Sequence, residues 1–157
     1  MIRVLQVVTS MNAGGIETML MNLYRKIDRT QVQFDFLVHR SEKAFYDDEI
    51  LQLGGKIYYV PPMHPVKYFL YVNSLNTFFS EHPYYQIVHS HINANSMYVL
   101  RAAKMANIPV RIAHSHIAST TTKGIHYKRF LFLYAREMLP RFTTDHFACG
   151  QLAGEYL

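Results

Sequence analysis

The sequence predicts a single α/β domain with a doubly wound, mostly parallel sheet of about six strands and helices on both faces. Two observations support this fold class. Short apolar or β-branched runs alternate about six times with longer segments of helical spacing. Several of these runs are apolar almost throughout, as expected for parallel strands covered on both faces.

The expected strands are the short apolar runs Arg3–Thr9, Gln33–Val38, Lys56–Val60, Ile87–Ser90, Val110–Ala113 and His146–Ala148. The expected helices between them are Ile16–Ile27, Lys43–Leu53, Val66–Phe79, Ala94–Ala106 and His126–Met138, and a further helix begins at Gln151. Apolar residues in the first helix recur at four-, three- and four-residue steps, which forms one buried stripe. The next four helices each stop before a glycine pair or a proline, at Gly54-Gly55, Pro83, Pro109 and Pro140.

Composition excludes several classes of protein. Half of the 157 residues are hydrophobic and 17% are charged, which is a folded rather than a disordered composition. The single Cys149 allows no internal disulfide and suits a reducing compartment. No secretory signal follows Met1, and no apolar stretch approaches the roughly 18 residues of a membrane span. We therefore expect a cytoplasmic location.

Positive charge is concentrated in the second part of the chain. Residues 1–60 contain seven Lys/Arg and seven Asp/Glu, so their charges balance. Residues 61–157 contain nine Lys/Arg and four Asp/Glu, which accounts for the whole net charge of +5. An anionic lipid surface or a phosphorylated ligand would explain this bias, and so would solubility alone. Nucleic acid is not an expected partner, because the basic residues are dispersed and match no recognised module.

Two glycines, Gly14 and Gly15, stand where the first strand turns into the first helix. Glycine allows a positive φ and close approach of a ligand, and helix N-terminal amides suit a phosphate. A plain tight turn explains the pair equally well. The loop is neither G-x-G-x-x-G nor a Walker sequence, and Val38-His39-Arg40 supplies no acidic residue after the second strand. A dinucleotide-binding domain is therefore disfavoured.

The strongest signal is a repeated His-Ser-His at the ends of two expected strands, at 89–91 and 114–116. Residues two apart on a strand face the same side, so neighbouring parallel strands would gather four imidazoles at one sheet edge. We expect His89 and His114, deeper in their strands, to be hydrogen-bonded core residues. We expect His91 and His116, at the tips, to be functional.

Two kinds of chemistry fit such a cluster. His-x-His pairs can bind zinc, which would suit a metal-dependent hydrolase, although no Asp or Glu lies near either motif. A histidine near neutral pH can instead bond to a hydroxyl, a phosphate or a developing oxyanion. The missing carboxylates favour the second use.

The segment 126–138 predicts an amphipathic helix. We expect an inward stripe of Leu131, Tyr134, Ala135 and Met138. Another face would carry Lys128, Phe132 and Arg136, which is the pattern of a helix lying on a membrane surface. A solvated basic face is equally compatible with these residues.

Several blocks of the chain, in this order and spacing, resemble retaining glycosyltransferases of the GT-B fold, glycosyltransferase family 4. The opening 3–8 followed by 14–17 resembles the start of these enzymes, and the two His-containing strands, 89–91 and 110–116, resemble bacterial exopolysaccharide and capsule enzymes of the group. Residues 146–150 resemble the last strand of their N-terminal domain. The resemblance covers essentially the whole chain.

The resemblance implies two Rossmann-like domains with the active site between them, the N-terminal one holding mainly the acceptor. It maps donor diphosphate contacts onto Gly14 and Gly15, the histidine near the reacting sugar onto His116, and acceptor contacts onto His91 and Asn93. It implies a nucleotide-sugar donor, transfer with retention in polysaccharide biosynthesis, and no metal or other cofactor. The acceptor would be a glycan or lipid-linked, with peripheral contact to the anionic inner membrane face.

The sequence stops at Leu157, before the donor-binding domain of the resembled family. We therefore expect residues 1–157 to be the N-terminal, acceptor-side domain and to have little transferase activity alone. Two other functions remain open from the residues: a binding module for nucleotide or anionic lipid, and the His-x-His metal-dependent hydrolase.

Overall fold

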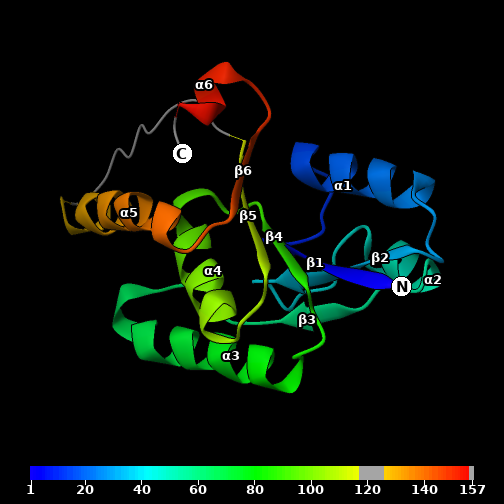
Figure 1. Cartoon of the computed structure of the whole chain (residues 1–157), viewed down its shortest axis with the longest axis horizontal. Helices are drawn as coiled ribbons and strands as arrows, with labels where there is room; N and C mark the ends of the chain where they lie inside the picture. Colours follow the sequence, from blue (N-terminus) through cyan, green and yellow to red (C-terminus); the bar gives the residue numbers. More distant parts are fainter. Residues whose placement is uncertain (117–125, 156–157) are drawn as a thin grey trace.

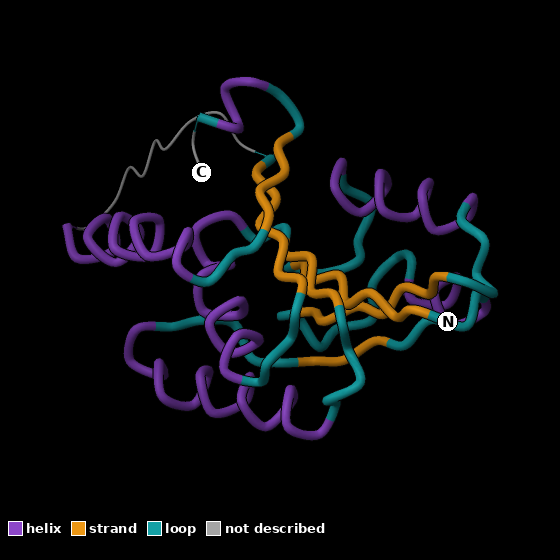
Figure 2. Tube along the Cα trace, viewed as in Figure 1, coloured by secondary structure: helices purple, strands orange, loops and turns teal. Residues whose placement is uncertain are grey.

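The computed structural model describes residues 1–116 and 126–155, with the backbone alone at 126–128. Its six strands form one sheet in the order β3-β2-β1-β4-β5-β6, and every neighbouring pair is parallel. Figures 1 and 2 show this twisted sheet running between two groups of helices. The order reverses between β1 and β4, as in a doubly wound fold. The predicted fold class is confirmed.

The observed elements follow the predicted ones closely. The strands are β1 Ile2–Val8, β2 Val32–Val38, β3 Ile57–Tyr59, β4 Ile87–Ser90, β5 Val110–Ser115 and β6 Asp145–Ala148. The α-helices are α1 Gly15–Lys26, α2 Asp47–Gln52, α3 Tyr68–Glu81, α4 Ser96–Met105, α5 His126–Met138 and α6 Gln151–Gly154. Short 3₁₀ turns are η1 Pro65–Lys67, η2 Asn93–Asn95 and η3 Leu139–Arg141. The second helix is shorter than predicted because the Asp47 carboxylate accepts the Ala44 N–H, which makes residues 44–46 a turn.

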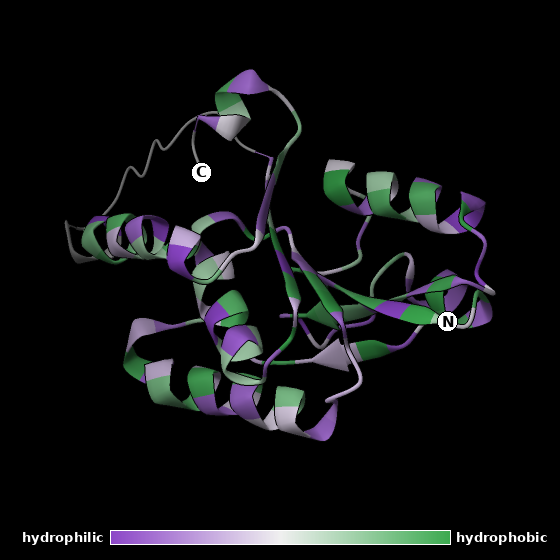
Figure 3. Cartoon of the chain, in the orientation of Figure 1, coloured by the Kyte–Doolittle hydropathy of each residue, from purple (hydrophilic) through white to green (hydrophobic). Residues whose placement is uncertain are grey.

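The sheet is covered by two hydrophobic layers. On one face α3, α4 and α5 pack against residues of β1, β2, β4 and β5 such as Val7, Val88 and Ala113. On the other face α1 and α2 pack against β1 and β2 through residues such as Val8 and Phe36. Hydrophobic colour dominates the central strands in Figure 3, whereas the helices are mixed, as amphipathic helices must be.

Helix α5 is oriented differently from the prediction. Ala135 is buried, but Phe132, expected on the outer face, is partly buried and packs against the core, and Tyr134, expected inside, is exposed. The helix is apolar on several sides, so spacing alone did not fix which side faces the sheet. Arg136 is only partly exposed, and the side chain of Lys128 lies outside the described residues. Among the described residues, the helices are all too short or too polar to cross a bilayer.

A buried carboxylate joins the first two strands to the start of β4. Asp35 of β2 is fully buried and accepts hydrogen bonds from Arg3 on β1, at 2.6 and 2.5 Å. It also accepts from the hydroxyl of Tyr85 at 2.7 Å and the backbone N–H of Lys56 at 2.8 Å. Burial and the Asp35 charge raise the pKa of Tyr85 well above its usual range. The hydroxyl is therefore a donor throughout the physiological range.

Replacing Asp35 by Asn should destabilise the fold by about 2–4 kcal/mol, because it removes the charge that holds Arg3 and leaves buried donors poorly paired. Urea unfolding of the two proteins at pH 7 measures this difference. The matched control is Asp48→Asn, which removes an exposed ion pair with Lys43 and should cost less than about 1 kcal/mol. Equal losses in the two variants would contradict the assigned role of Asp35.

Candidate functional site

The candidate site lies at the carboxyl ends of β1, β4 and β5, where the strand order reverses. Ligands of open α/β sheets bind at such a switch point. The His91 N–H donates to the Val7 carbonyl at 2.9 Å, which continues the pairing of β4 with β1 just past the end of the strand. The loop between β1 and α1, which contains Gly14 and Gly15, begins at the same edge of the sheet.

All four predicted histidines meet at this edge. His89 Nε2 lies 3.1 Å from His114 Nδ1, and His91 Nδ1 lies 2.9 Å from His116 Nε2. The rings of His89 and His91 are 4.2 Å apart between centroids, and those of His114 and His116 are 4.1 Å apart. The prediction that each His-Ser-His turns two imidazoles to one side of the sheet is therefore confirmed. We call these four residues the histidine cluster.

The order of burial within the histidine cluster differs from the prediction. His91, expected at an open tip, is only 2% exposed, whereas His89 and His114, expected in the core, are partly exposed. The difference arises because the helices cover this face of the sheet unevenly. Helix α1 packs over β1 and β2, whereas among the described residues the β6 side of the same face is open and all four β6 residues are exposed.

Gln6 determines the tautomer of the neutral His91 ring. The buried Gln6 amide oxygen lies 2.9 Å from His91 Nε2, so this nitrogen carries the proton and donates it. His91 Nδ1 therefore has a lone pair, which accepts a hydrogen bond from His116 Nε2–H. In turn, Nδ1 of His116 carries a lone pair. The chain from Gln6 to His116 fixes both tautomers.

The histidine cluster is neutral at pH 7. Burial, followed by repulsion from the neighbouring imidazoles, lowers the pKa of His89 to about 3 and that of His116 to about 4. The same two causes hold the pKa of His91 far below its usual range. Burial also lowers the pKa of His114. At neutral pH these residues therefore act as hydrogen-bonding or ligating groups rather than as cations.

The glycine loop is extended rather than left-handed. Gly14 caps α1 with φ −131° and ψ 173°, and its carbonyl accepts the Thr18 N–H at 2.9 Å. Neither glycine of the pair uses the positive φ that glycine allows. A Cβ on Gly14 would collide with the carboxylate of Glu17, whereas one on Gly15 would meet nothing within 4 Å. The space beside Gly15, at the N-terminus of a 12-residue helix, suits an anionic group.

Asn93 follows the histidine cluster in a left-handed conformation, with φ 53°. Asparagine is among the few residues that adopt this region readily. Its side-chain oxygen is buried, and among the described residues it has no hydrogen-bond partner. A buried acceptor of this kind is stabilised by a donor from a ligand or water.

Three residues of the site were not singled out in the sequence. Gln6 is a polar residue inside an apolar strand, which is a signal that the sequence did contain. Phe147 of β6 contacts the rings of His89 and His114 edge-on, at 5.4 and 5.8 Å between centroids. His39, after β2, is buried between the Val8 carbonyl and the Tyr71 hydroxyl, each at 3.0 Å. The last two contacts have no local signal in the sequence, because they depend on the strand order.

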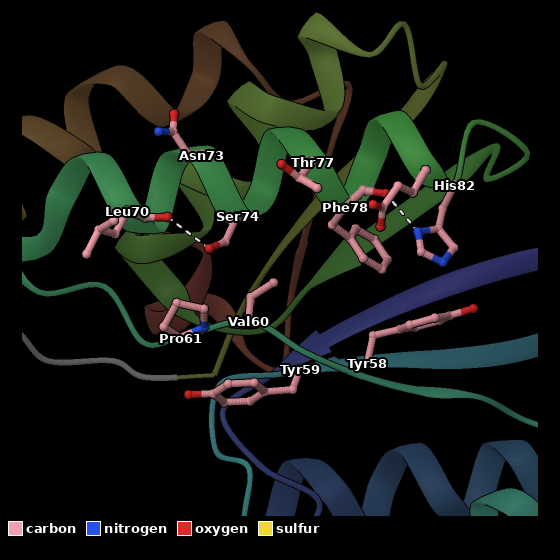
Figure 4. A pocket seen from close by; sticks show the side chains of 11 residues that line it. Tyr58, Tyr59, Val60, Pro61, Leu70, Asn73, Ser74, Thr77, Phe78 and His82 are labelled. Atoms are coloured by element: carbon pink, nitrogen blue, oxygen red, sulfur yellow. Dashed lines mark hydrogen bonds between the residues drawn. The ribbon is translucent and has the colours of Figure 1, made fainter.

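The groove in Figure 4 lies away from the histidine cluster. It measures about 480 Å³ and runs between β3 and one side of α3, with Tyr58, Phe78 and His82 among its lining residues. Strands β2 and β1 separate β3 from β4 in the sheet. A second groove of about 350 Å³ lies between the start of α3 and α5, lined by Met63, Pro65, Tyr68, Phe69, Tyr98, Leu131 and Tyr134.

Comparison with known proteins identifies the family of the chain. The profile of Glycosyltransferase Family 4 matches residues 13–149, which include the glycine loop and the histidine cluster. The chain belongs to glycosyltransferase family 4. It is 41% identical over 156 residues to a Bacillus subtilis (strain 168) protein named "Putative glycosyltransferase EpsF", a match that covers 99% of this chain and 40% of that protein.

Solved structures show the same fold at low sequence identity. The crystal structure of Anabaena Alr3699/HepE in complex with UDP matches with a TM-score of 0.69 at 13% identity, over 99% of this chain and 40% of that one. The crystal structure of Acinetobacter baumannii MurG matches with a TM-score of 0.61 at 13% identity, over 95% of this chain and 41% of that one. The chain thus spans about 40% of the length of these relatives.

The stability of the domain should fall as the pH drops below about 6.5. In the unfolded chain histidines bind protons near pH 6.5, whereas in the folded domain those of the histidine cluster resist protonation. The unfolded state therefore binds more protons between pH 6.5 and about 4. Urea unfolding in metal-free buffer at pH 7 and pH 5 measures the loss, before most carboxylates titrate.

His116→Asn should reduce this loss between pH 7 and pH 5, because one of the resistant groups is removed. The matched control is His146→Asn, a change at an exposed histidine of β6 outside the histidine cluster. If the free energy of unfolding falls between pH 7 and pH 5 by no more in wild type than in His116→Asn, then His116 is not held neutral by the fold.

Proposed function

We propose that this chain is the N-terminal, acceptor-side domain of a two-domain glycosyltransferase that takes its sugar from a nucleotide-sugar donor. Membership of glycosyltransferase family 4 supports the reaction class. The observation that carries the site is that the His91–His116 pair lies at the same edge of the sheet from which the glycine loop starts. Similar folds solved with UDP, and with UDP and glucose, support a nucleotide-sugar donor.

The proposed reaction exchanges one bond to the anomeric carbon for another. The bond to the leaving diphosphate breaks, and a bond to the acceptor hydroxyl oxygen forms on the same face of the sugar, with retention. The O–H bond of the acceptor breaks, and its proton passes to the departing diphosphate. The exposed N–H groups beside Gly15 would bind the diphosphate as negative charge develops on it. The Nδ1 lone pair of His116 would accept a hydrogen bond from a donor-sugar hydroxyl and hold the ring in place.

The acceptor would bind on the β4 side of the same edge. The buried side-chain oxygen of Asn93 offers an acceptor for a sugar hydroxyl. The structure does not place His91 for direct contact with the acceptor, because it is buried and its two ring nitrogens are bonded to Gln6 and His116, so its role would be to orient His116. Neutral imidazoles suit a sugar better than cations do, because hydroxyls are uncharged and need both donors and acceptors. We propose that the transfer needs no metal cofactor, since no Asp or Glu flanks either His-Ser-His. The named relative EpsF suggests a role in polysaccharide biosynthesis.

A chimera tests this function. The matching 156 residues of the Bacillus subtilis relative are replaced by this chain, and membranes are assayed for incorporation of label from a panel of nucleotide sugars. We expect transfer, and we expect His116→Ala to lower it at least about 100-fold because the donor sugar is no longer held. The matched control, His146→Ala, should change it less than about twofold. Gly15→Ala should mainly raise the KM for the donor.

The outcomes separate the alternatives. Full activity in the His116→Ala chimera would contradict the assigned site. A folded chimera without transfer, beside an active parent, would contradict the transferase function and favour a module that binds nucleotide or anionic lipid.

We also propose that the acceptor is lipid-linked and that the face formed by α3 and α5 meets an anionic membrane surface. Val66, Phe69 and Phe130 are 88%, 78% and 69% exposed around the apolar groove of about 350 Å³. Exposed Lys67 and Arg129 stand on the same elements and would attract anionic headgroups.

Vesicle flotation tests this contact. The double variant Phe69→Ser and Phe130→Ser should weaken binding to phosphatidylglycerol vesicles at least about tenfold, because two side chains worth about 1.5–3 kcal/mol each no longer enter the bilayer. The matched control is Leu51→Ser, an exposed apolar residue of α2. Equal binding by all three proteins, or none by wild type, would contradict the membrane contact.

A further inference from the structure

The histidine cluster has a second property that hydrogen bonding to a sugar does not require. One ring nitrogen from each of His89, His91 and His114 lies within 4.8 Å of the other two. The two shortest separations between rings are 3.1 Å, from His89 Nε2 to His114 Nδ1, and 2.9 Å, from His91 Nδ1 to His116 Nε2. Imidazole nitrogens from two neighbouring strands thus lie close to one another.

These separations are close to what a small metal ion requires. Zinc binds imidazole nitrogen at about 2.0–2.1 Å, so two ligands on a tetrahedral ion are about 3.3 Å apart. The pair of His89 and His114 needs only a small widening to reach that spacing. Such a site also needs lone pairs, and both nitrogens of this pair face each other with at most one proton between them.

Gln6 provides the support that metal-binding histidines usually have. It accepts the proton of His91 Nε2, which leaves the Nδ1 lone pair directed into the histidine cluster. A ligand histidine typically donates its other ring N–H to an oxygen in this way, which fixes the tautomer and the ring orientation.

The ligand set selects the class of metal. Neutral nitrogen ligands without carboxylates suit zinc, copper and nickel, whereas magnesium and calcium require oxygen. Among the described residues the β6 side of the sheet leaves a route for the ion, since His89 and His114 are partly exposed there and Phe147 is 48% exposed.

We propose that His89, His91 and His114 form a binding site for a divalent transition-metal ion, with zinc as the expected occupant. This site is not a cofactor site of the proposed transfer. A consequence that rests on the proposed function is inhibition, because zinc bound at His91 Nδ1 would take the lone pair that accepts the His116 N–H and so displace His116 from the sugar.

Zinc chloride titrated into the purified chain, in competition with a chromophoric chelator, tests the binding. We expect one zinc per chain. His89→Asn and His114→Asn should each weaken binding at least about tenfold, and Gln6→Ala, which removes the support of His91, about 10–100-fold. The matched control His146→Asn should not change it. Circular dichroism verifies that each variant is folded.

X-ray absorption of the zinc-loaded wild-type chain makes the test independent of the variants. We expect three or four nitrogen ligands at about 2.0–2.1 Å with imidazole scattering. Fewer than three imidazoles, more than one equivalent bound at random, or affinity unchanged in both His89→Asn and His114→Asn would overturn the site.

The chimera assay tests the inhibitory consequence separately. Zinc should inhibit transfer, and His89→Asn should relieve that inhibition, measured as the ratio of the variant's own transfer with and without zinc. If the chimera transfers no sugar but the chain still binds one zinc through the three histidines, the metal site stands and the proposed function fails. If transfer occurs but zinc does not bind, the function stands and the site fails.

Discussion

The parallel register of β4 between β1 and β5 is the constraint on which the site depends. His89 pairs with Ile112 and Ser90 with Ala113, so His91 comes level with His114, one step beyond the paired residues. On the other side Gln6 pairs with His89, which puts its amide within reach of His91. A slip of one residue would turn the histidines of one strand to the opposite face of the sheet and separate the two pairs. The buried network around Asp35, which ties β2 to β1 and to the start of β4, helps to hold this register.

Much of this arrangement was readable in the sequence. Strand β4 has the predicted bounds, and the two-residue period of a strand is enough to put both histidines of each motif on one side. The alternation of strands and helices gave the fold class, because few architectures accommodate it. The resemblance to family 4 likewise rested on short blocks in a fixed order, and the match over residues 13–149 confirms it.

What the sequence did not predict depends on which elements cover which. His91 is more buried than His89 because helix α1 covers the β1 side of the face and the β6 side is open among the described residues. Phe132 faces the core, whereas Tyr134 is exposed. Helix α5 has apolar residues on both of these sides, and tertiary packing determines which side is buried. The extended backbone at Gly14, in place of a positive φ, follows from its role as the cap of α1. Each is a tertiary effect with no local signal.

Neutral, mutually hydrogen-bonded imidazoles are the common basis of the proposed sugar binding and of the proposed metal site. The most direct test is long-range ¹H–¹⁵N correlation of the histidine side chains in the metal-free chain. At pH 7 it should show His91 as the neutral tautomer protonated at Nε2, with its ring nitrogens unchanged down to pH 5. A His91 ring that titrates near pH 6.5, like a histidine in water, would contradict the account.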